Sequence, residues 1–514
     1  MTLFDKTSGL VAVLALLSAS ACHKANPVAA AAGSATAIGA SVLAAPIADD
    51  AIKGEVTSEL FKDKKLDQAG INVTVNAGIV ALTGKVDNLL SSDRSTRIAE
   101  SVRGVRSVSN RLSITPPARP DQSIQGDVQK ALLYNAATAK MPIHATAKGG
   151  IVTLTGSVQS RQEKQLAERI ADGVRGVRLT QNELTQTSDS KREDRTVAND
   201  VKSRLAWDVL VEHDPIVATV KDAQVTLAGT VGSAAEKSRA VNDAWVDGVA
   251  KVDATALEVK WWDQPDKNLR PFTAKSDQDI ATAIKDAAYY DPRVKSFNIN
   301  PSVSHGVATL TGTVSTLKAK MAAEALARNT VGVTTVVNLL VARSQEPVTD
   351  RMLENRVKDA LIFDPIVEAH DVFVTVKGGQ VTLSGNIGTY FESAEAFDVA
   401  SRLAGVTNVD NRLQVLDPAV PYVYVAYLDP FTPYVEAWYV VSPRPLEADS
   451  KIQDRINAEF TWSPFVRPED VHVVVSGGKV TLTGTVQTFR ERRAAGESAL
   501  EAGAVSVDNE LKVG

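Results

Sequence analysis

The stretch Val152–Gly156, with the sequence Val-Thr-Leu-Thr-Gly, recurs five more times in this 514-residue chain with small changes. Each copy is a run of strand-forming residues that ends on a glycine. By subtraction of their numbers, these glycines are 72, 73, 83, 73 and 99 residues apart: Gly84, Gly156, Gly229, Gly312, Gly385 and Gly484. The near-constant interval predicts an array of six small modules of one fold.

The residues around each glycine indicate how a module is built. An aspartate 35 residues earlier begins a stretch with apolar residues at four-residue steps, such as Ile124 and Val128, which predicts a first helix capped by that aspartate. Two strands follow, joined by a turn such as Lys148–Gly150. A second helix carries paired small residues, such as Ala167 and Ala171, and a third strand follows a Gly-Val pair. The predicted fold class is α+β, a tandem array of six αββαβ modules, each a three-stranded mixed sheet with two helices on one face.

The strand glycine and the paired small residues predict close packing of the second helix on the sheet, so the six glycines are interpreted as structural. A phosphate-binding loop would need a Lys and a Ser or Thr after its glycines, and no copy has this pattern. An aromatic residue ends the first helix in five copies, while the first copy has Lys62. Core packing and a shared ligand-stacking position are both open for these aromatic residues: Tyr134, Trp207, Tyr290, Phe363 and Trp462.

The αββαβ order, the Val-x-Leu-x-Gly-x-Val strand and the later Gly-Val-x-x-Val-x-Asn-x-Leu run are similar to the BON domain, the bacterial osmotic-induction and nodulation module. The resemblance covers about four fifths of the chain. It implies a periplasmic or envelope module without enzyme activity that binds phospholipid surfaces or envelope partners. It also implies a link to osmotic stress and, from some two-copy relatives, chaperone-like action.

The predicted segments follow from the repeat. They are a signal peptide (1–21), an alanine-rich tether (22–48), modules 1 to 3 (49–115, 121–187 and 193–260), a tryptophan-containing linker (261–276), modules 4 and 5 (277–342 and 350–416), an insert rich in tyrosine and proline (417–448), and module 6 (449–514).

The first residues are typical of a secretion signal. A charged start with Lys6 precedes the apolar run 10–17 and an Ala-Ser-Ala cleavage signature at 19–21. Cys22, the one cysteine of the chain, follows immediately, and the arrangement resembles a bacterial lipoprotein signal. We therefore expect a periplasmic protein that is anchored to the outer membrane through a lipid on Cys22. Release as a soluble periplasmic protein is the alternative.

Composition and motifs argue against several function classes. A net charge of −5 argues against nucleic acid as the main partner. The six histidines lack the convergent spacing of a metal site, and no nucleophile–base arrangement stands out. We expect no enzyme activity, no cofactor, no metal site and no small-molecule substrate, and leave the oligomeric state open.

Binding residues are expected where the copies differ. The early modules are the more basic, since residues 116–187 hold nine Lys and Arg against six Asp and Glu, whereas 350–417 hold six against eleven. The basic candidates for membrane or partner contacts are Arg103, Arg106, Arg111, Arg161, Lys164, Arg169, Arg175 and Arg178. The aromatic candidates are Trp261, Trp262, Tyr422, Tyr424, Tyr427, Phe431, Tyr434, Trp438 and Tyr439. The alternative for the basic residues is ordinary solvated surface, and the alternative for the aromatic residues is packing between modules.

These observations favour a non-catalytic envelope protein, linked to envelope or osmotic stress, that presents its modules as a flexible or semi-rigid chain. The expected partners are anionic phospholipid surfaces or envelope proteins, bound by weak contacts repeated along the chain. A periplasmic holdase for unfolded proteins and a scaffold of an envelope-spanning complex are the alternatives.

Overall fold

The computed structural model describes residues 47–62, 66, 70–187, 192–212, 214–263, 275–294, 298–344, 347–415 and 447–514. Residues 45–514 form one compact unit. The expected signal peptide, Cys22, and the aromatic candidates of the insert, from Tyr422 to Tyr439, lie outside the described residues. Within the described ranges, no helix combines the length and the hydropathy needed to cross a membrane.

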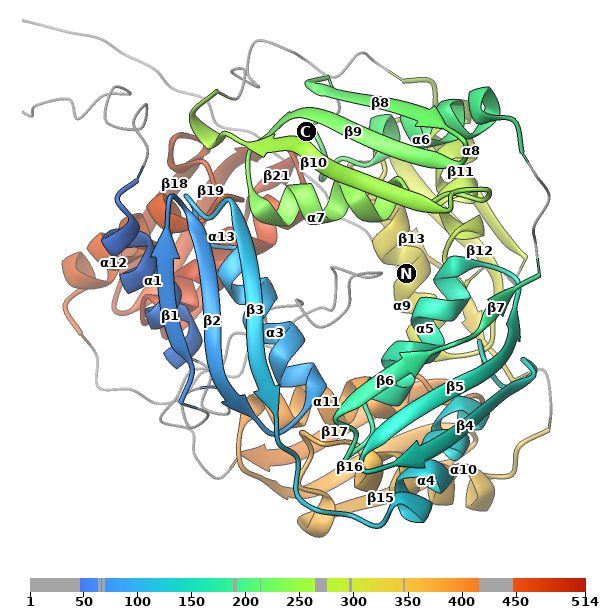
Figure 1. Cartoon of the computed structure of the whole chain (residues 1–514). Helices are drawn as coiled ribbons and strands as arrows, with labels where there is room; N and C mark the ends of the chain where they lie inside the picture. Colours follow the sequence, from blue (N-terminus) through green and yellow to red (C-terminus); the bar gives the residue numbers. More distant parts are fainter. Residues whose placement is uncertain are drawn as a thin grey trace, which may run out of the picture. The chain divides into compact units, whose positions relative to one another are not determined.

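Each of the six repeats folds as helix, strand, strand, helix, strand (Figure 1). The first helices are α1 (Asp49–Phe61), α4 (Asp121–Tyr134), α6 (Asp194–Trp207), α8 (Asp277–Tyr289), α10 (Asp350–Phe363) and α12 (Asp449–Trp462). The second helices are α3 (Leu89–Glu100), α5 (Arg161–Asp172), α7 (Ala234–Asp243), α9 (Leu317–Arg328), α11 (Tyr390–Ser401) and α13 (Phe489–Glu501). Short 3-10 turns lie at η2 (Trp261–Asp263), η4 (Ala369–Asp371) and η5 (Pro468–Asp470).

The strands keep the same order in every module. The first strands are β1 (Asn72–Asn76), β4 (Ile143–Lys148), β8 (Ile216–Lys221), β11 (Ile299–Ser304), β15 (Val372–Lys377) and β18 (Val471–Ser476). The second strands are β2 (Ile79–Val86), β5 (Ile151–Val158), β9 (Gln224–Val231), β12 (Val307–Val314), β16 (Gln380–Ile387) and β19 (Lys479–Val486). The third strand is continuous in β3 (Ser107–Ile114), β10 (Lys251–Val259) and β17 (Asn408–Val415), and it is split into β6 (Leu179–Asn182) and β7 (Thr185–Gln186), β13 (Thr335–Asn338) and β14 (Val341–Ala342), and β20 (Ser506–Asn509) and β21 (Lys512–Val513).

The second strand is central in each sheet. In module 2, β5 pairs antiparallel with β4, so that Leu154 faces Ala145, and parallel with β6, so that Leu154 faces Asn182. The parallel pair needs a crossover, and the second helix supplies it. In the blue module of Figure 1, α1 and α3 lie on the same side of β1, β2 and β3. The predicted α+β module with a mixed three-stranded sheet is confirmed.

The module core lies between the sheet and its two helices. In module 2, Val128 of the first helix and Val152 and Leu154 of the central strand have no exposed surface, and neither do Ala167 and Ala171 of the second helix. The predicted apolar stripe of the first helix is confirmed in this way, and the small residues are buried as expected. The other face of the sheet keeps some exposed apolar side chains.

The repeated aspartate has a different role from the predicted cap. Asp121 is the first residue of α4 and makes no cap hydrogen bond; its carboxylate accepts hydrogen bonds from the backbone amides of Gly149 and Gly150, at 2.8 and 3.0 Å. All six modules repeat this bond, from Asp49, Asp121, Asp194, Asp277, Asp350 and Asp449 to the turn residues 28 and 29 positions later. The capping prediction was wrong, because the aspartate ties the hairpin turn to the first helix. Side-chain caps begin the second helices, as Ser160 does for α5, and Ser276 and Thr349 cap the first helices α8 and α10.

The strand glycine is confined by the neighbouring strand. At Gly156, where φ is +125°, a Cβ atom would lie 1.9 Å from the carbonyl oxygen of Pro142, which precedes β4. The equivalent carbonyl lies within 2.6 Å of such an atom at the other five strand glycines. The close approach expected at this position therefore comes from the residue that leads into the first strand of the hairpin and not from the second helix.

Candidate functional site

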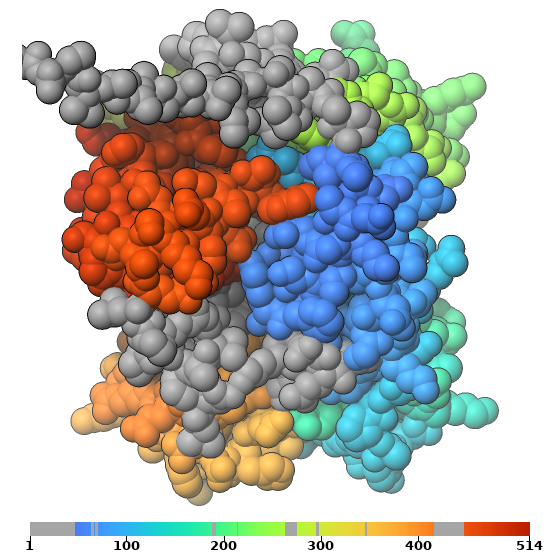
Figure 2. Space-filling model, turned by 90° about the vertical axis from the view of Figure 1, so that its left-hand side faces the viewer, coloured from blue at the N-terminus to red at the C-terminus, as the bar shows by residue number. Residues whose placement is uncertain are grey.

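Three pairs of modules share one kind of contact: module 1 with 6, module 2 with 5, and module 3 with 4. In each pair, the last carbonyl of a first helix accepts a hydrogen bond from an amide in the turn after the partner's second helix. The bonds are Arg103 N to Trp462 O at 2.9 Å, Arg175 N to Phe363 O at 2.7 Å, and Val331 N to Trp207 O at 3.0 Å. Figure 2 shows module 1, in blue, beside module 6, in orange-red. Within the described residues the repeats are thus packed together, whereas the sequence had suggested a flexible or semi-rigid chain.

Two of the basic candidates take part in these contacts. The Nη2 atom of Arg103 donates to the carbonyls of Ser463 and Val466, at 2.6 and 3.3 Å. Arg175 uses the same atom toward the carbonyls of Asp364 and Val367 in module 5, at 2.7 and 2.8 Å. Burial lowers the pKa of the Arg103 guanidinium. These two side chains are occupied between modules, so they are poorly placed to contact a membrane.

The aromatic residues that end the first helices pack against other modules. Trp462 contacts the core of module 1, Tyr134 that of module 5, Trp207 that of module 4, and Tyr290 that of module 3. Phe363 is buried, with the Lys130 ammonium of module 2 at 5.4 Å from its ring centroid. The packing interpretation describes these positions better than ligand stacking, but the core that Trp462, Tyr134, Trp207 and Tyr290 cover belongs in each case to a different module.

Three further basic candidates lie against the protein itself. The Arg161 guanidinium lies 3.5 Å from the ring centroid of Trp245 in module 3. Lys164 donates to the carbonyl of Leu184 at 2.7 Å. Arg169 lines a hollow between modules 1, 2, 4 and 5.

Arg106, Arg111 and Arg178 are the exposed members of the basic set. Arg106 and Arg178 hold equivalent positions, and the Nη1 atom of each lies 3.4 Å from a carbonyl of its own hairpin turn. Modules 3 to 6 have Ala250, Thr334, Thr407 and Val505 at this position.

The linker tryptophans form a perpendicular pair. The rings of Trp261 and Trp262 lie 5.9 Å apart, and the Arg103 guanidinium lies 5.9 Å from the Trp261 ring. Trp262 is 37 % exposed, whereas Trp261 is half-buried. Trp262 therefore offers the larger aromatic surface to a partner.

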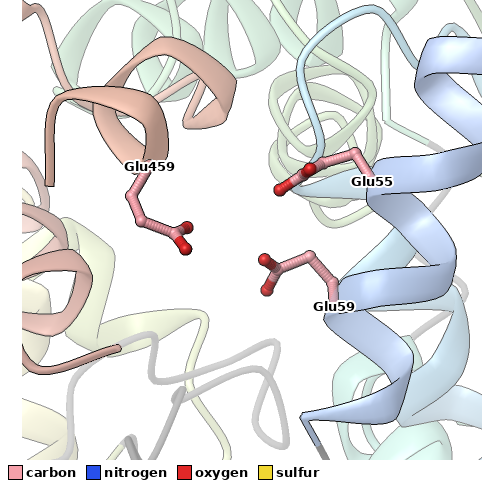
Figure 3. A group of neighbouring side chains, drawn as sticks. All are labelled: Glu55, Glu59 and Glu459. Carbon is pink, nitrogen blue, oxygen red and sulfur yellow. The ribbon is translucent and has the colours of Figure 1, made fainter. Parts of the chain in front are cut away.

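A group of glutamates at the contact of modules 1 and 6 escaped the sequence analysis (Figure 3). Glu55 and Glu59 of α1 and Glu459 of α12 each have a carboxylate oxygen within 4.8 Å of the others. Burial, followed by the charges of Glu59 and Glu459, raises the pKa of Glu55 to about 7.

Lys62 supplies the positive charge of this group. Its Nζ atom lies 2.5 Å from Glu59, 3.1 Å from Glu459 and 3.4 Å from Glu501. Burial lowers the pKa of Lys62, but the three glutamates outweigh it and raise that pKa above its usual value. With one ammonium group already in place, the cluster is an ion-pair network and a poor metal site. The sequence signal was the lysine at a position where the other copies have an aromatic residue.

Comparison with known proteins agrees with this architecture. The sequence pattern of the BON domain matches residues 48–116, 120–188, 193–260, 276–344, 349–417 and 448–514. This chain is a member of the BON domain family. It is similar to osmotically-inducible protein Y of Escherichia coli K12, with 26 % identity over 143 residues that cover 26 % of this chain and 71 % of that protein. It is also similar to the outer membrane lipoprotein DolP of Haemophilus influenzae, with 31 % identity over 150 residues that cover 28 % of this chain and 77 % of that protein.

Among solved structures, the chain matches the C-terminal domain of CdsD, a structural protein of the type III secretion system of Chlamydia trachomatis. The match has 13 % identity and a TM-score of 0.12, and it covers 40 % of this BON chain and 98 % of that chain. A second structure of CdsD matches with 15 % identity and the same TM-score. A TM-score this low carries no information on function.

Proposed function

We propose that this BON protein is a non-catalytic binding protein of the cell envelope, which contacts anionic phospholipid surfaces through modules 1 and 2. Its family membership supports the envelope assignment, since one relative is named as an outer membrane lipoprotein and another as osmotically inducible. The proposal includes secretion to the periplasm, a lipid anchor on Cys22 and a role in envelope or osmotic stress.

The observation that carries the lipid assignment is the placement of the exposed arginines. Arg106 and Arg178 occupy one position beside the hairpin turn, and Arg111 is exposed on β3. The other four modules have uncharged residues at the position that Arg106 and Arg178 share. Each arginine near an anionic membrane contributes about 1 kcal/mol of attraction, so a few of them suffice for weak, salt-sensitive binding.

Vesicle flotation tests this assignment. The full chain should float with phosphatidylglycerol-containing vesicles at low salt, and less so with phosphatidylcholine alone or at high salt. The double variant Arg106→Glu with Arg178→Glu should lose most of the binding. Lys479→Glu in module 6, which is 58 % exposed at its side chain, is the matched control and should behave as wild type. Equal flotation with neutral vesicles, or full binding by the double variant, would contradict the proposal.

Cys22→Ala tests the anchor separately. In cells that process lipoproteins, the wild-type chain should fractionate with the outer membrane and incorporate labelled fatty acid. The variant should do neither, while its purified form keeps any binding that depends on Arg106 and Arg178. An unchanged fractionation of the variant would rule out the lipid on Cys22.

A holdase function is the second candidate, because the outer sheet faces expose large apolar side chains. Phe373 is 66 % exposed, Val217 60 % and Val341 57 %. Suppression of aggregation of an unfolded client, reduced by Phe373→Ser, together with no vesicle binding, would favour this function. Crosslinking to one specific envelope protein would favour a scaffold instead.

A further inference from the structure

A hollow lies where modules 1, 2, 4 and 5 meet. Its volume is about 820 Å³, including the part open to solvent. Residues from α5 and α11, the start of α9, and the turns after α4 and α8 line it.

One wall of the hollow is apolar. Leu90 of α3, Ala136 and Ala137 after α4, and Leu166 and Ile170 of α5 supply it. Hydrocarbon buried against such a wall gains roughly 25 cal/mol for each Å² removed from water. This wall therefore suits the apolar body of a ligand.

The remaining lining is rich in positive charge. Four cationic residues, Arg169, Arg293, Lys318 and Arg402, face two acidic ones in the lining, Glu395 and Asp398, and Asp291 beside Arg293 is a third, which gives 4 − 3 = +1 if all are ionised. Lys318 bonds to Asp398 at 2.6 Å, and Arg402 bonds to both Asp398 and Glu395. Arg293 is held by Asp291 in its own module. These ion pairs fix the cations in place, and the surplus charge attracts an anion.

Glu395 adds an independent indication of a ligand. Its residue is 1 % exposed, and its Oε1 atom accepts from Arg402 at 3.1 Å. Its Oε2 atom is buried and has no hydrogen-bond partner among the described residues. A buried polar atom of this kind costs free energy unless something else satisfies it. Burial and the nearby charge of Asp364 raise the pKa of Glu395 to about 8, so at neutral pH this carboxyl group can donate a hydrogen bond to an anion.

We propose that the hollow binds a small amphipathic organic carboxylate. Its hydrocarbon chain lies on the apolar wall that includes Leu90 and Ile170, and its head group lies between Arg169, Lys318 and Glu395. This site goes beyond the proposed membrane contact, because it lies among the modules and not on the outer faces of modules 1 and 2. The carboxylate could be a chain released from lipid or a shorter metabolite, and these two sources share the same head-group chemistry.

Isothermal titration calorimetry with the full chain tests the site. Sodium decanoate, kept below its micelle concentration, should bind saturably at one site. Decyltrimethylammonium, with the same chain and the opposite charge, should bind at least about tenfold more weakly, which corresponds to about 1.4 kcal/mol. Butyrate that binds as tightly as decanoate would assign the site to a metabolite, whereas much weaker butyrate binding would assign it to a lipid-derived chain.

Two variants locate the binding. Ala137→Phe fills the apolar side, and Arg169→Gln removes one cation; each should weaken decanoate binding about tenfold or more. Lys148→Gln, at an exposed position of the same module, is the control and should bind as wild type. A decanoate-based diazirine probe should label peptides that contain lining residues of the hollow, which are Leu90, Arg293 and residues within 135–170 and 315–402, in the wild-type chain.

Three results would overturn the proposal. They are the absence of saturable decanoate binding, wild-type affinity in a folded Ala137→Phe variant, or labelling confined to other peptides. If Ala137→Phe fails to fold, wild-type affinity in Arg169→Gln overturns it equally. Membrane flotation measured on the same samples keeps this result separate from that of the proposed function.

Discussion

At the residue scale, the repeated aspartate shows how one sequence pattern can serve two purposes. An acidic residue at a helix start stabilises the helix dipole wherever its side chain points. In this protein the carboxylate also binds the two amides of a distant hairpin turn, as Asp49 does with Ala77 and Gly78 at 2.7 and 2.8 Å. The sequence pattern predicted a helix cap instead of this bond, because the bond requires the turn to lie over the helix end.

Asp49 and Asp50 provide a matched pair to separate these effects. Both are acidic residues in the first turn of α1, but the bonds to the turn come from Asp49. Asp49→Asn should lower the free energy of unfolding by about 1 kcal/mol, because the amide cannot accept both hydrogen bonds. Asp50→Asn should cost clearly less. Chemical denaturation measures both, and equal losses would show that the dipole alone matters.

At the element scale, the second helix packs against the rest of the module through small residues. Ala167 and Ala171 have no exposed surface, and α5 contacts α4 as well as β5 and β6. Small residues four positions apart occupy one helical stripe, so the sequence was sufficient to predict which side of the helix faces the core. The confinement of Gly156 was predicted at the right position, but it arises from the carbonyl of Pro142.

Enlarging a side chain on this stripe should destabilise the protein. Ala171→Leu adds three carbons where no space exists, and we expect a loss of about 1–3 kcal/mol. Gln125→Leu, on the exposed side of α4, is the control and should change stability little. Thermal melting of the full chain, with hydrogen exchange to localise the effect in module 2, measures this. Unchanged melting of Ala171→Leu would contradict the packing described for α5.

At the scale of the whole molecule, the contacts between modules bury ionisable groups from repeats that are far apart in the sequence. Asp172 at the end of α5 accepts a hydrogen bond from Thr180 at 2.6 Å and is influenced by Asp93 of module 1. Burial is the main cause that raises its pKa to about 7. Stability gained from this shift is complete below the ordinary pKa of about 3.8, and it is lost as pH rises through about 7.

Asp172→Asn should therefore change the pH dependence of folding. The variant keeps a hydrogen-bond acceptor for Thr180 but cannot ionise. Relative to wild type, its free energy of unfolding should increase between pH 5 and pH 8, by up to about 2 kcal/mol. Urea denaturation at the two pH values gives this difference. A wild-type chain and variant that respond alike to pH would contradict the assignment.

The candidate binding surface was only partly predictable from the sequence. The charge asymmetry directed attention to modules 1 and 2, and Arg106, Arg111 and Arg178 are exposed there. Arg103 and Arg175 belong to the same basic set, but their guanidinium groups bind carbonyls of modules 6 and 5. Composition indicates where charge is concentrated, whereas it cannot show which part of that surface another module covers.

The sequence by itself determined the number of modules, the order of their elements and the residues that face each core. These properties follow from periodicities of two and 3.6 residues, which are local and repeat with the chain. The tertiary structure decided which modules pair: modules 1 and 6, for example, are joined by the ion pair of Lys62 and Glu459. It also decided where the hollow lined by Glu395 lies. Such contacts join residues hundreds of positions apart, and they depend on the fit of whole surfaces that no single repeat encodes.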